Sequence, residues 1–286
     1  MKIIILSAKG VNQIPLKMDK EPQITLEWLG SAFNNNNFND INIVGGKDIE
    51  KLSLHNLEAK YFYNPKWNDT GSIFSLLLVK EILLSDDCII SYSDVVHRPE
   101  AITRLVETDT DCSILVDGLW KSRYSGRTSL SLSRAEKVIL DSNNFVQNII
   151  IGDSIAGERL AEFAGMIYIS KKVSRTFFQK NAERLFDEKS HESIPYLLNK
   201  LIKSNVSIRP VDVNGDWAEL DDTKSDGKKI LDFQRFVFGT KSQTLKRLKL
   251  GSKPREMRWV ALISALVMQV LAVSTGKVPN HGGQIL

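Results

Sequence analysis

Cysteine is scarce in this sequence, and the common glycine-rich nucleotide-binding signatures are missing. Two of the 286 residues are cysteines, Cys88 and Cys112, and no CxxC pair occurs. A zinc site or a disulfide framework is therefore disfavoured, and a reducing, cytoplasmic location is expected. Neither a GxGxxG fingerprint nor a P-loop follows the first apolar run, Met1–Leu6, which argues against a dehydrogenase.

The sequence lacks a strong excess of one charge. Lysine and arginine total 38 against 34 acidic residues, which gives a net charge of +4 spread along the chain. We therefore expect no nucleic acid as a partner, and a site for polyanionic small molecules explains this excess equally well.

The main apolar run, Trp259–Val273, has about 15 residues, short of the roughly 20 that a transmembrane helix needs. It predicts a helix that is buried or covered by a protein partner, with an interfacial membrane helix as the alternative. The oligomeric state stays open, with a homodimer as one candidate.

Apolar strand patterns and helical patterns alternate through the first half of the chain. Strands are expected at residues 2–6, 41–44, 59–63, 88–91 and 113–116, and helices at 23–33, 72–84 and 98–107. Ser72 is a candidate N-cap. Short links between such elements favour a mostly parallel sheet flanked by helices. Ligands bind beyond the carboxyl ends of such strands, so Asp94, Asp117 and the loop Ser7–Gly10 are expected at one edge.

The second half of the chain has a more mixed pattern. Strands are expected at residues 135–140, 148–151, 163–170 and 206–211, helices at 172–181 and 194–204, and a turn at 217–222. We place one domain at residues 1–230 and a helical C-terminal extension, without an assigned role, at 231–286.

The most informative feature is an apolar strand that runs into a lone acid, Cys88-Ile-Ile-Ser-Tyr-Ser-Asp94. A second acid-rich stretch, Asp216–Asp222, lies far downstream. Two carboxylates brought to one place hold a divalent cation against phosphate oxygens, which points to chemistry on a nucleoside triphosphate. Each acid taken alone is equally compatible with a turn, a cap or a solvated surface position.

Three other segments carry residues suited to phosphate binding. The small residues of Ser7–Gly10 allow backbone N–H groups to approach a phosphate closely. Lys20 is placed to neutralise triphosphate charge, and Gly71-Ser72 would present polar groups to a base or ribose from the start of a helix. The alternatives are a simple strand exit, a solvated lysine and an ordinary capped helix.

Together these stretches resemble the nucleoside-triphosphate transferase (sugar nucleotidyltransferase-like) family, and within it the phosphocholine and phosphonate cytidylyltransferases. The matching segments follow the family's order over roughly residues 1–230: Ile3–Ala8, Lys20–Pro22, Thr25–Trp28, Ile41–Gly46, Asn64–Trp67, Thr70–Leu76, Ile89–Asp94, Glu162–Gly165 and Trp217–Asp221. The resemblance implies a Rossmann-like α/β nucleotidyltransferase fold with a mostly parallel central sheet. It also implies attack of an acceptor phosphate on the α-phosphorus of a nucleoside triphosphate, with release of pyrophosphate.

The resemblance also implies roles for individual residues. Asp94 and Asp221 would ligate Mg²⁺, and Lys20 would stabilise the triphosphate or the acceptor phosphate. The nucleotide, expected to be CTP, would be bound by Ser7, Ala8, Lys9, Gly10, Gly71 and Ser72.

The phosphate loop departs from the family's pattern. Lys9 stands where the family usually has glycine, and no arginine precedes Pro15. Lys9 or Lys17 would then supply the missing charge, as a point-charge ammonium rather than a guanidinium fork.

The acceptor is expected to be a small phosphorylated or phosphonate compound. The candidates for binding it are Trp120, Arg123 and Arg127, with an exposed charged hairpin as the alternative for this stretch. Trp120 is also considered, with Trp67 and Tyr124, as a cation–π site for a quaternary amine, against ordinary packing as the alternative.

The leading hypothesis is therefore a magnesium-dependent cytidylyltransferase. Two alternatives stay open: a degenerate nucleotide-binding or scaffold module without turnover, and a sugar-phosphate uridylyltransferase.

Overall fold

The structure is a computed structural model, and it describes residues 1–8, 22–47, 49–50, 58–124, 129–152, 159–185 and 191–219. All of them belong to one compact unit, Met1–Phe233. Within these ranges, the helices are too short or too polar to cross a membrane. Trp259–Val273 and the predicted extension at 231–286 lie outside the described residues.

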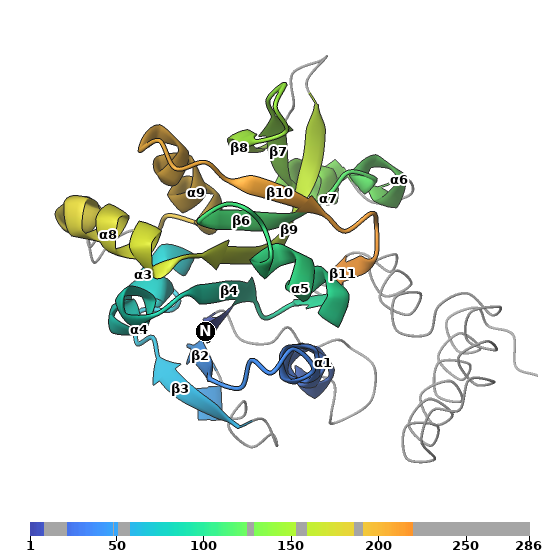
Figure 1. Cartoon of the computed structure of the whole chain (residues 1–286). Helices are drawn as coiled ribbons and strands as arrows, with labels where there is room; N and C mark the ends of the chain where they lie inside the picture. The colour runs from blue at the N-terminus through green and yellow to red at the C-terminus, as the bar shows by residue number, and fades with distance from the viewer. Residues whose placement is uncertain are drawn as a thin grey trace, which may run out of the picture. The chain divides into compact units, whose positions relative to one another are not determined.

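A nine-stranded mixed sheet forms the centre of the fold. Its main path runs in the order β10 (Arg209–Asp212), β6 (Cys112–Asp117), β9 (Leu160–Ile169), β4 (Cys88–Tyr92), β1 (Lys2–Ser7), β2 (Ile41–Gly45) and β3 (Ala59–Tyr63). Figure 1 shows this order from β10 at the top to β3 at the bottom. All neighbours on this path are parallel except β9, which is antiparallel to both β4 and β6. Off this path, β7 (Glu136–Leu140) pairs with β9 and with β8 (Val146–Ile151).

Helices cover both faces of the sheet, because the side chains of each strand alternate between two cores. In β1, Ile4 and Leu6 join one core and Ile3 and Ile5 join the other. The first core is covered by α3 (Ser72–Leu77), α4 (Lys80–Ser85), α8 (Lys171–Leu185) and α9 (Ile194–Lys203), and the second by α1 (Pro22–Asn34) and α5 (Pro99–Val106). The predicted α/β class, with a mostly parallel sheet flanked by helices, is therefore confirmed.

The single helix predicted at residues 72–84 is wrong, because the chain leaves helical geometry at Val79. There φ and ψ are −113° and 26°, which separates α3 from α4. Val79 is buried in the same core as Ile73 and Leu83, so packing overrides the continuous helical pattern. Ser72 is not the cap either: the N-cap position is Gly71, without a side-chain bond.

Two other local predictions are wrong. Residues 217–219 of the predicted turn form a strand, β11 (Trp217–Glu219), which pairs antiparallel with β5 (Val95–His97). The charged stretch considered as a hairpin begins instead with the short helix α6 (Trp120–Tyr124), and α7 (Ser129–Arg134) follows it. Each of β5 and β11 has three residues, too few for an alternating pattern to stand out in the sequence.

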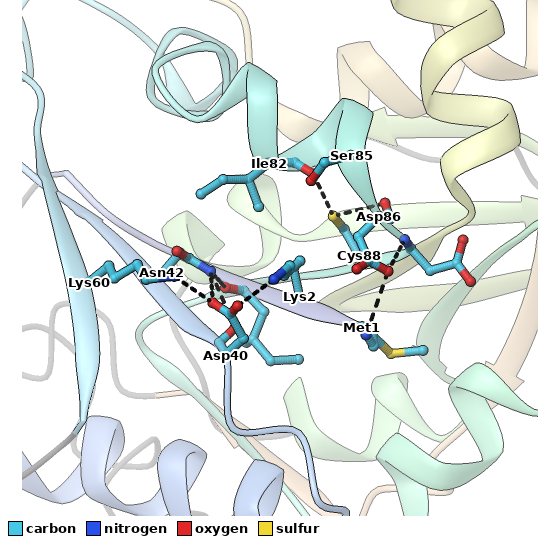
Figure 2. Close-up of polar contacts among 11 residues, drawn as sticks. Met1, Lys2, Asp40, Asn42, Lys60, Ile82, Ser85, Asp86 and Cys88 are labelled. Carbon is cyan, nitrogen blue, oxygen red and sulfur yellow. Dashed lines mark hydrogen bonds and ion pairs between the residues drawn. The ribbon is translucent and has the colours of Figure 1, made fainter.

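The amino-terminal edge of the sheet carries carboxylates that are paired with cations. Figure 2 shows Asp40 between Lys2 and Lys60, with Nζ–Oδ distances of 2.5 and 3.4 Å. Asn42 donates from Nδ2 to Asp40 Oδ1 at 3.1 Å. The hydrogen bond from Lys2 is the main cause that lowers the pKa of Asp40 and raises the pKa of Lys2. These charges stabilise the fold at the edge opposite to the expected ligand edge.

Candidate active site at the carboxyl edge of the sheet

Asp94 lies at the carboxyl end of β4, in the short link to β5, with a half-buried side chain. The preceding residue is tied to the central strand, because the Ser93 N–H donates to the carbonyl of Leu6 at 3.2 Å. The end of β4 and the end of β1 are therefore held side by side. This is the edge at which the sequence predicts both Asp94 and the phosphate loop.

Strand β11 brings a second acidic segment to the same edge. In its antiparallel register with β5, Glu219 lies opposite Val95, the residue after Asp94. Asp221, the predicted second metal ligand, follows two residues later and lies outside the described residues. Among the residues that the structure does describe, no group of three or more histidine, cysteine or acidic side chains is arranged to hold a metal.

Further carboxylates gather around Tyr92, the last residue of β4. Its hydroxyl donates to Glu136 Oε1 and Oε2 at 3.3 and 3.2 Å. The pKa of Glu136 is raised to about 8, chiefly by burial and in smaller part by the charges of Glu219, Asp94 and Glu162. The same surroundings raise the pKa of Tyr92, chiefly through burial. Four acidic side chains from separate elements therefore share one electrostatic environment at this edge.

Sequence reasoning missed Glu136. It begins a strand of two charged residues followed by three apolar ones, Glu136-Lys-Val-Ile-Leu140, and nothing in that pattern distinguishes it from an exposed glutamate. Its position becomes visible only when β7 is paired with β9, which sets it beside the end of β4.

The first two residues of the predicted phosphate loop lie at the end of β1. Ser7 is 2% exposed, and within the described ranges its hydroxyl has no hydrogen-bond partner. A buried hydroxyl without a partner costs free energy, so a ligand oxygen would be a favourable occupant. Ala8 accepts from the Lys47 N–H at 3.1 Å, which links this loop to the end of β2.

A buried asparagine organises the neighbouring loop. Asn64 is fully buried, and its Nδ2 donates to Thr70 Oγ1 at 3.3 Å and to Ser75 Oγ at 3.0 Å. Its Oδ1 accepts from the Lys66 N–H at 2.8 Å, and its own N–H donates to the carbonyl of Gly45 at 2.7 Å. The side chain therefore fixes the loop that follows β3 against the end of β2.

Gly71 and Ser72 stand where that loop enters α3. A Cβ on Gly71 would lie 2.2 Å from the Glu192 carbonyl oxygen and 2.4 Å from that of His191. Ile73 donates its N–H to the same Glu192 carbonyl at 3.2 Å. Gly71 therefore allows two segments of backbone to touch, and nucleotide binding by Gly71 and Ser72 stays a prediction.

Asp117 lies at the predicted edge but is fully buried. Its Oδ1 accepts from the Leu119 N–H at 2.9 Å and its Oδ2 accepts from Trp217 Nε1 at 3.0 Å. The carboxylate thus binds groups of the protein itself.

Trp120 is buried at the start of α6, and its Nε1 donates to the Leu160 carbonyl at 3.2 Å. The Nζ atoms of Lys121 and Lys137 lie 5.8 and 5.9 Å from its ring centroid. The protein's own ammonium groups therefore stand within cation–π distance of this ring, and a role in acceptor binding stays a prediction.

Several predicted site residues cannot be placed. Lys9, Gly10, Lys20, Arg127 and Asp221 lie outside the described residues. The backbone of Arg123 belongs to α6, while its side chain is not described. The roles predicted for these residues stay predictions.

The chain is similar to proteins that transfer nucleotides. It is 25% identical over 244 residues to the CTP:phosphoglutamine cytidylyltransferase of Campylobacter jejuni, covering 77% of this chain and 96% of that protein. No protein-family model matches the sequence.

Solved structures of nucleotidyltransferases share the fold. The inositol-1-phosphate CTP transferase of T. maritima has a TM-score of 0.62 at 16% identity, covering 84% of this chain and 96% of its own. The CTP:phosphocholine cytidylyltransferase of Streptococcus pneumoniae has a TM-score of 0.52 at 16% identity, covering 82% and 96%. The resemblance inferred from the sequence is confirmed: the chain has the fold of nucleotidyltransferases and a cytidylyltransferase as a relative.

Proposed function

We propose that this chain is a magnesium-dependent cytidylyltransferase that transfers CMP from CTP to a small phosphorylated or phosphonate acceptor. A phosphate or phosphonate oxygen of the acceptor attacks the α-phosphorus of CTP, the bond to the β-phosphate oxygen breaks, and pyrophosphate leaves. Such a transfer needs positioning and charge neutralisation rather than a side-chain nucleophile.

The observation that carries this proposal is the pairing of β5 with β11. Glu219 lies opposite Val95, so the segment that leads to Asp221 starts one residue away from Asp94. Each further residue adds at most about 3.8 Å between Cα atoms, which supports the proposal that Asp221 reaches the end of the sheet where Asp94 lies. The donor set consists of carboxylate oxygens, which suits Mg²⁺.

Bound there, Mg²⁺ would neutralise triphosphate oxygens, with Asp94 and Asp221 as its protein ligands. The nucleotide would lie against the end of β1, where Ser7 offers a buried hydroxyl and Ala8 begins the loop to Gly10. Lys9 and Lys20 would supply cationic charge to the phosphates, and Gly71 and Ser72 would contact the nucleoside. The bonded Asn64 loop supports this arrangement by fixing the chain that leads to Gly71.

The acceptor is proposed from the names of the similar proteins together with the chain's own residues. The relative from Campylobacter jejuni is named for phosphoglutamine, and the structural neighbours for inositol 1-phosphate and phosphocholine. All three are phosphorylated small molecules. Arg123 and Arg127, which follow the buried Trp120 in the sequence, are the cations proposed to bind the acceptor phosphate.

The test is a screen of four nucleoside triphosphates against phosphoglutamine, phosphocholine, inositol 1-phosphate, aminoethylphosphonate and glucose 1-phosphate, with pyrophosphate as the readout. We expect pyrophosphate release that requires CTP, a phosphorylated acceptor and Mg²⁺. Asp94→Asn should abolish it while the far-UV circular dichroism spectrum is retained. Asp109→Asn is the matched control, because Asp109 pairs with Arg209 in an exposed turn before β6.

Three other results would decide against the proposal. Release from UTP with a sugar phosphate would make the chain a uridylyltransferase. Tight CTP binding in calorimetry without release from any acceptor would make it a nucleotide-binding module. Full activity in Asp94→Asn would remove Asp94 from the metal site.

A further inference from the structure

The buried carboxylate of Asp117 and the indole of Trp217 form a link between two separate sheets. Asp117 ends β6 in the central sheet, and Trp217 begins β11 in the two-stranded sheet. The Trp217 Nε1–H donates to Asp117 Oδ2 at 3.0 Å, and the donor and acceptor side chains are 3% and 0% exposed. Removing either partner of a hydrogen bond at such a buried position leaves the other partner unsatisfied and destabilises the link.

The two-stranded sheet needs such an anchor, because β5 and β11 have only three residues each. An isolated pair of strands is marginally stable at best, even when it is longer. The position of β11 must therefore be fixed by contacts outside its own ladder.

Contacts of Trp217 supply that fixation. Its ring lies parallel to that of His97, at an interplanar angle of 4° with 5.9 Å between centroids. His97 is its partner in the β5 ladder, and His97 Nε2 lies 2.8 Å from the Ala164 carbonyl oxygen on β9. Trp217 is thus connected to the central sheet through β6 on one side and through His97 and β9 on the other.

The segment before Trp217 is linked to the same strand. Asp212 Oδ1 accepts from the Gly118 N–H at 3.0 Å, and the Val213 N–H donates to the Val116 carbonyl at 2.8 Å. These bonds hold the turn between β10 and β11. The hydrogen bond between Asp117 and Trp217 reaches β11 itself, two residues before Glu219.

We propose that Asp117 is a positioning residue: through Trp217 it fixes the register of β11 on β5 and so holds Glu219, two residues before the proposed ligand Asp221, opposite Val95. This inference rests on the proposed function for its catalytic consequence, although the anchoring itself is testable without turnover. It assigns an internal task to an acid that the sequence places at the same edge of the sheet as Asp94.

Trp217→Phe is the sharpest probe, because it removes the N–H donor and keeps an aromatic ring against His97. We expect faster hydrogen–deuterium exchange of the β11 amides in the full-length protein, without a change in exchange across β1 and β2. In the active enzyme, the Mg²⁺ concentration for half-maximal rate should rise by about tenfold while the KM for CTP changes little. A loss of global stability alone would not raise the Mg²⁺ concentration for half-maximal rate while leaving the KM for CTP unchanged.

Asp117→Asn should act in the same direction, since an amide presents a hydrogen-bond acceptor to only one of the two donors now bound. In the double variant the Trp217 donor is gone, so the asparagine oxygen is left to Leu119. We therefore expect the double variant to unfold at no lower denaturant concentration than Trp217→Phe, which is the non-additivity that a direct interaction requires.

Asp216→Asn is the matched control in the same segment. Asp216 is adjacent to Trp217 and forms an exposed ion pair with Arg98 at 3.3 Å, which is worth little in water. Wild-type exchange in β11 is expected for it.

The failures are distinguishable. Absence of pyrophosphate release by the wild-type protein overturns the proposed function. Hydrogen–deuterium exchange of the β11 amides then still tests whether the bond between Asp117 and Trp217 holds β11 in place. Unchanged exchange in Trp217→Phe, or an unchanged Mg²⁺ midpoint in an active enzyme, overturns the role of Asp117.

Discussion

Tyr92 donates its hydroxyl hydrogen to both carboxyl oxygens of Glu136, at 3.3 and 3.2 Å, and so joins the end of β4 to the start of β7. Burial raises the pKa of Glu136 from 4.5 to about 8. Between these values the unfolded chain releases the proton while the folded protein keeps it. Stability must therefore fall as pH rises from about 4.5 to about 8, and this contribution stops changing above the folded pKa.

Glu136→Gln should flatten that decline, because glutamine keeps a hydrogen-bond acceptor and has no proton to lose. The measurement is urea unfolding at a series of pH values from about 5 to about 9, where the slope of unfolding free energy against pH counts the protons released on unfolding. Tyr92→Phe removes a hydrogen bond that lowers the pKa of Glu136, so its decline should extend to higher pH. An identical slope in wild type and Glu136→Gln would contradict the raised pKa.

Asn64→Ala should destabilise the protein by at least about 1–3 kcal/mol, because it leaves buried partners unsatisfied. The side chain donates to Thr70 and Ser75 and accepts from the Lys66 N–H. Denaturant unfolding measures the loss, and Asn35→Ala at the exposed end of α1 is the control. Because the loop leads to Gly71, the KM for CTP should rise more than kcat falls. An unchanged KM would separate this loop from the nucleotide.

The parts of the fold that follow from the sequence are those with strong local patterns. Strands such as Ile3–Leu6 and Cys88–Ile90 are apolar on both faces because helices cover both sides of the sheet, so the sequence shows them clearly as apolar runs. The same logic predicted that Asp94 stands at a strand end, as it does.

The remaining features depend on contacts between distant segments. The pairing of β5 with β11 joins residues about 120 apart in sequence, with three residues in each strand and no periodicity to reveal it. Asp117 and Asp94 look alike in sequence, each following an apolar strand. Only the packing of Trp217 shows that Asp117 has an internal partner. The break at Val79 likewise reflects packing in the core rather than helix propensity.

Asp40→Asn should lower stability by at most about 1 kcal/mol near neutral pH, because the pair with Lys2 is only partly shielded from water. The bond to Lys2 holds the pKa of Asp40 below its usual 3.8. This contribution is therefore present above the unfolded pKa and is lost as pH falls through the folded one. The variant should show a shallower acid-side decline in unfolding free energy. Pyrophosphate release should be unaffected, since Asp40 pairs with Lys2 and Asn42 at the start of β1 and β2 (Figure 2), whereas Asp94 follows the carboxyl end of β4.

Gly46→Ala should disturb both stability and nucleotide binding, because Gly46 is the point where three segments meet. A Cβ there would lie 2.2 Å from Trp67 Cβ and 2.3 Å from the Ala8 carbonyl oxygen. The Ala8 contact is backbone and cannot rotate away, so the end of β1 must shift, at a cost of about 1–3 kcal/mol.

Gly152→Ala is the control for this substitution, because no non-adjacent atom of the described residues lies within 4 Å of its Cβ position and its φ of +100° adds only local backbone strain. Both variants should lose stability in urea unfolding, whereas only Gly46→Ala should weaken CTP binding in calorimetry. Equal CTP affinity in Gly46→Ala and wild type would show that the Ser7-Ala8 end of β1 does not contact the nucleotide. A shifted Ala8 carbonyl accompanied by weaker binding would link that backbone position to the triphosphate.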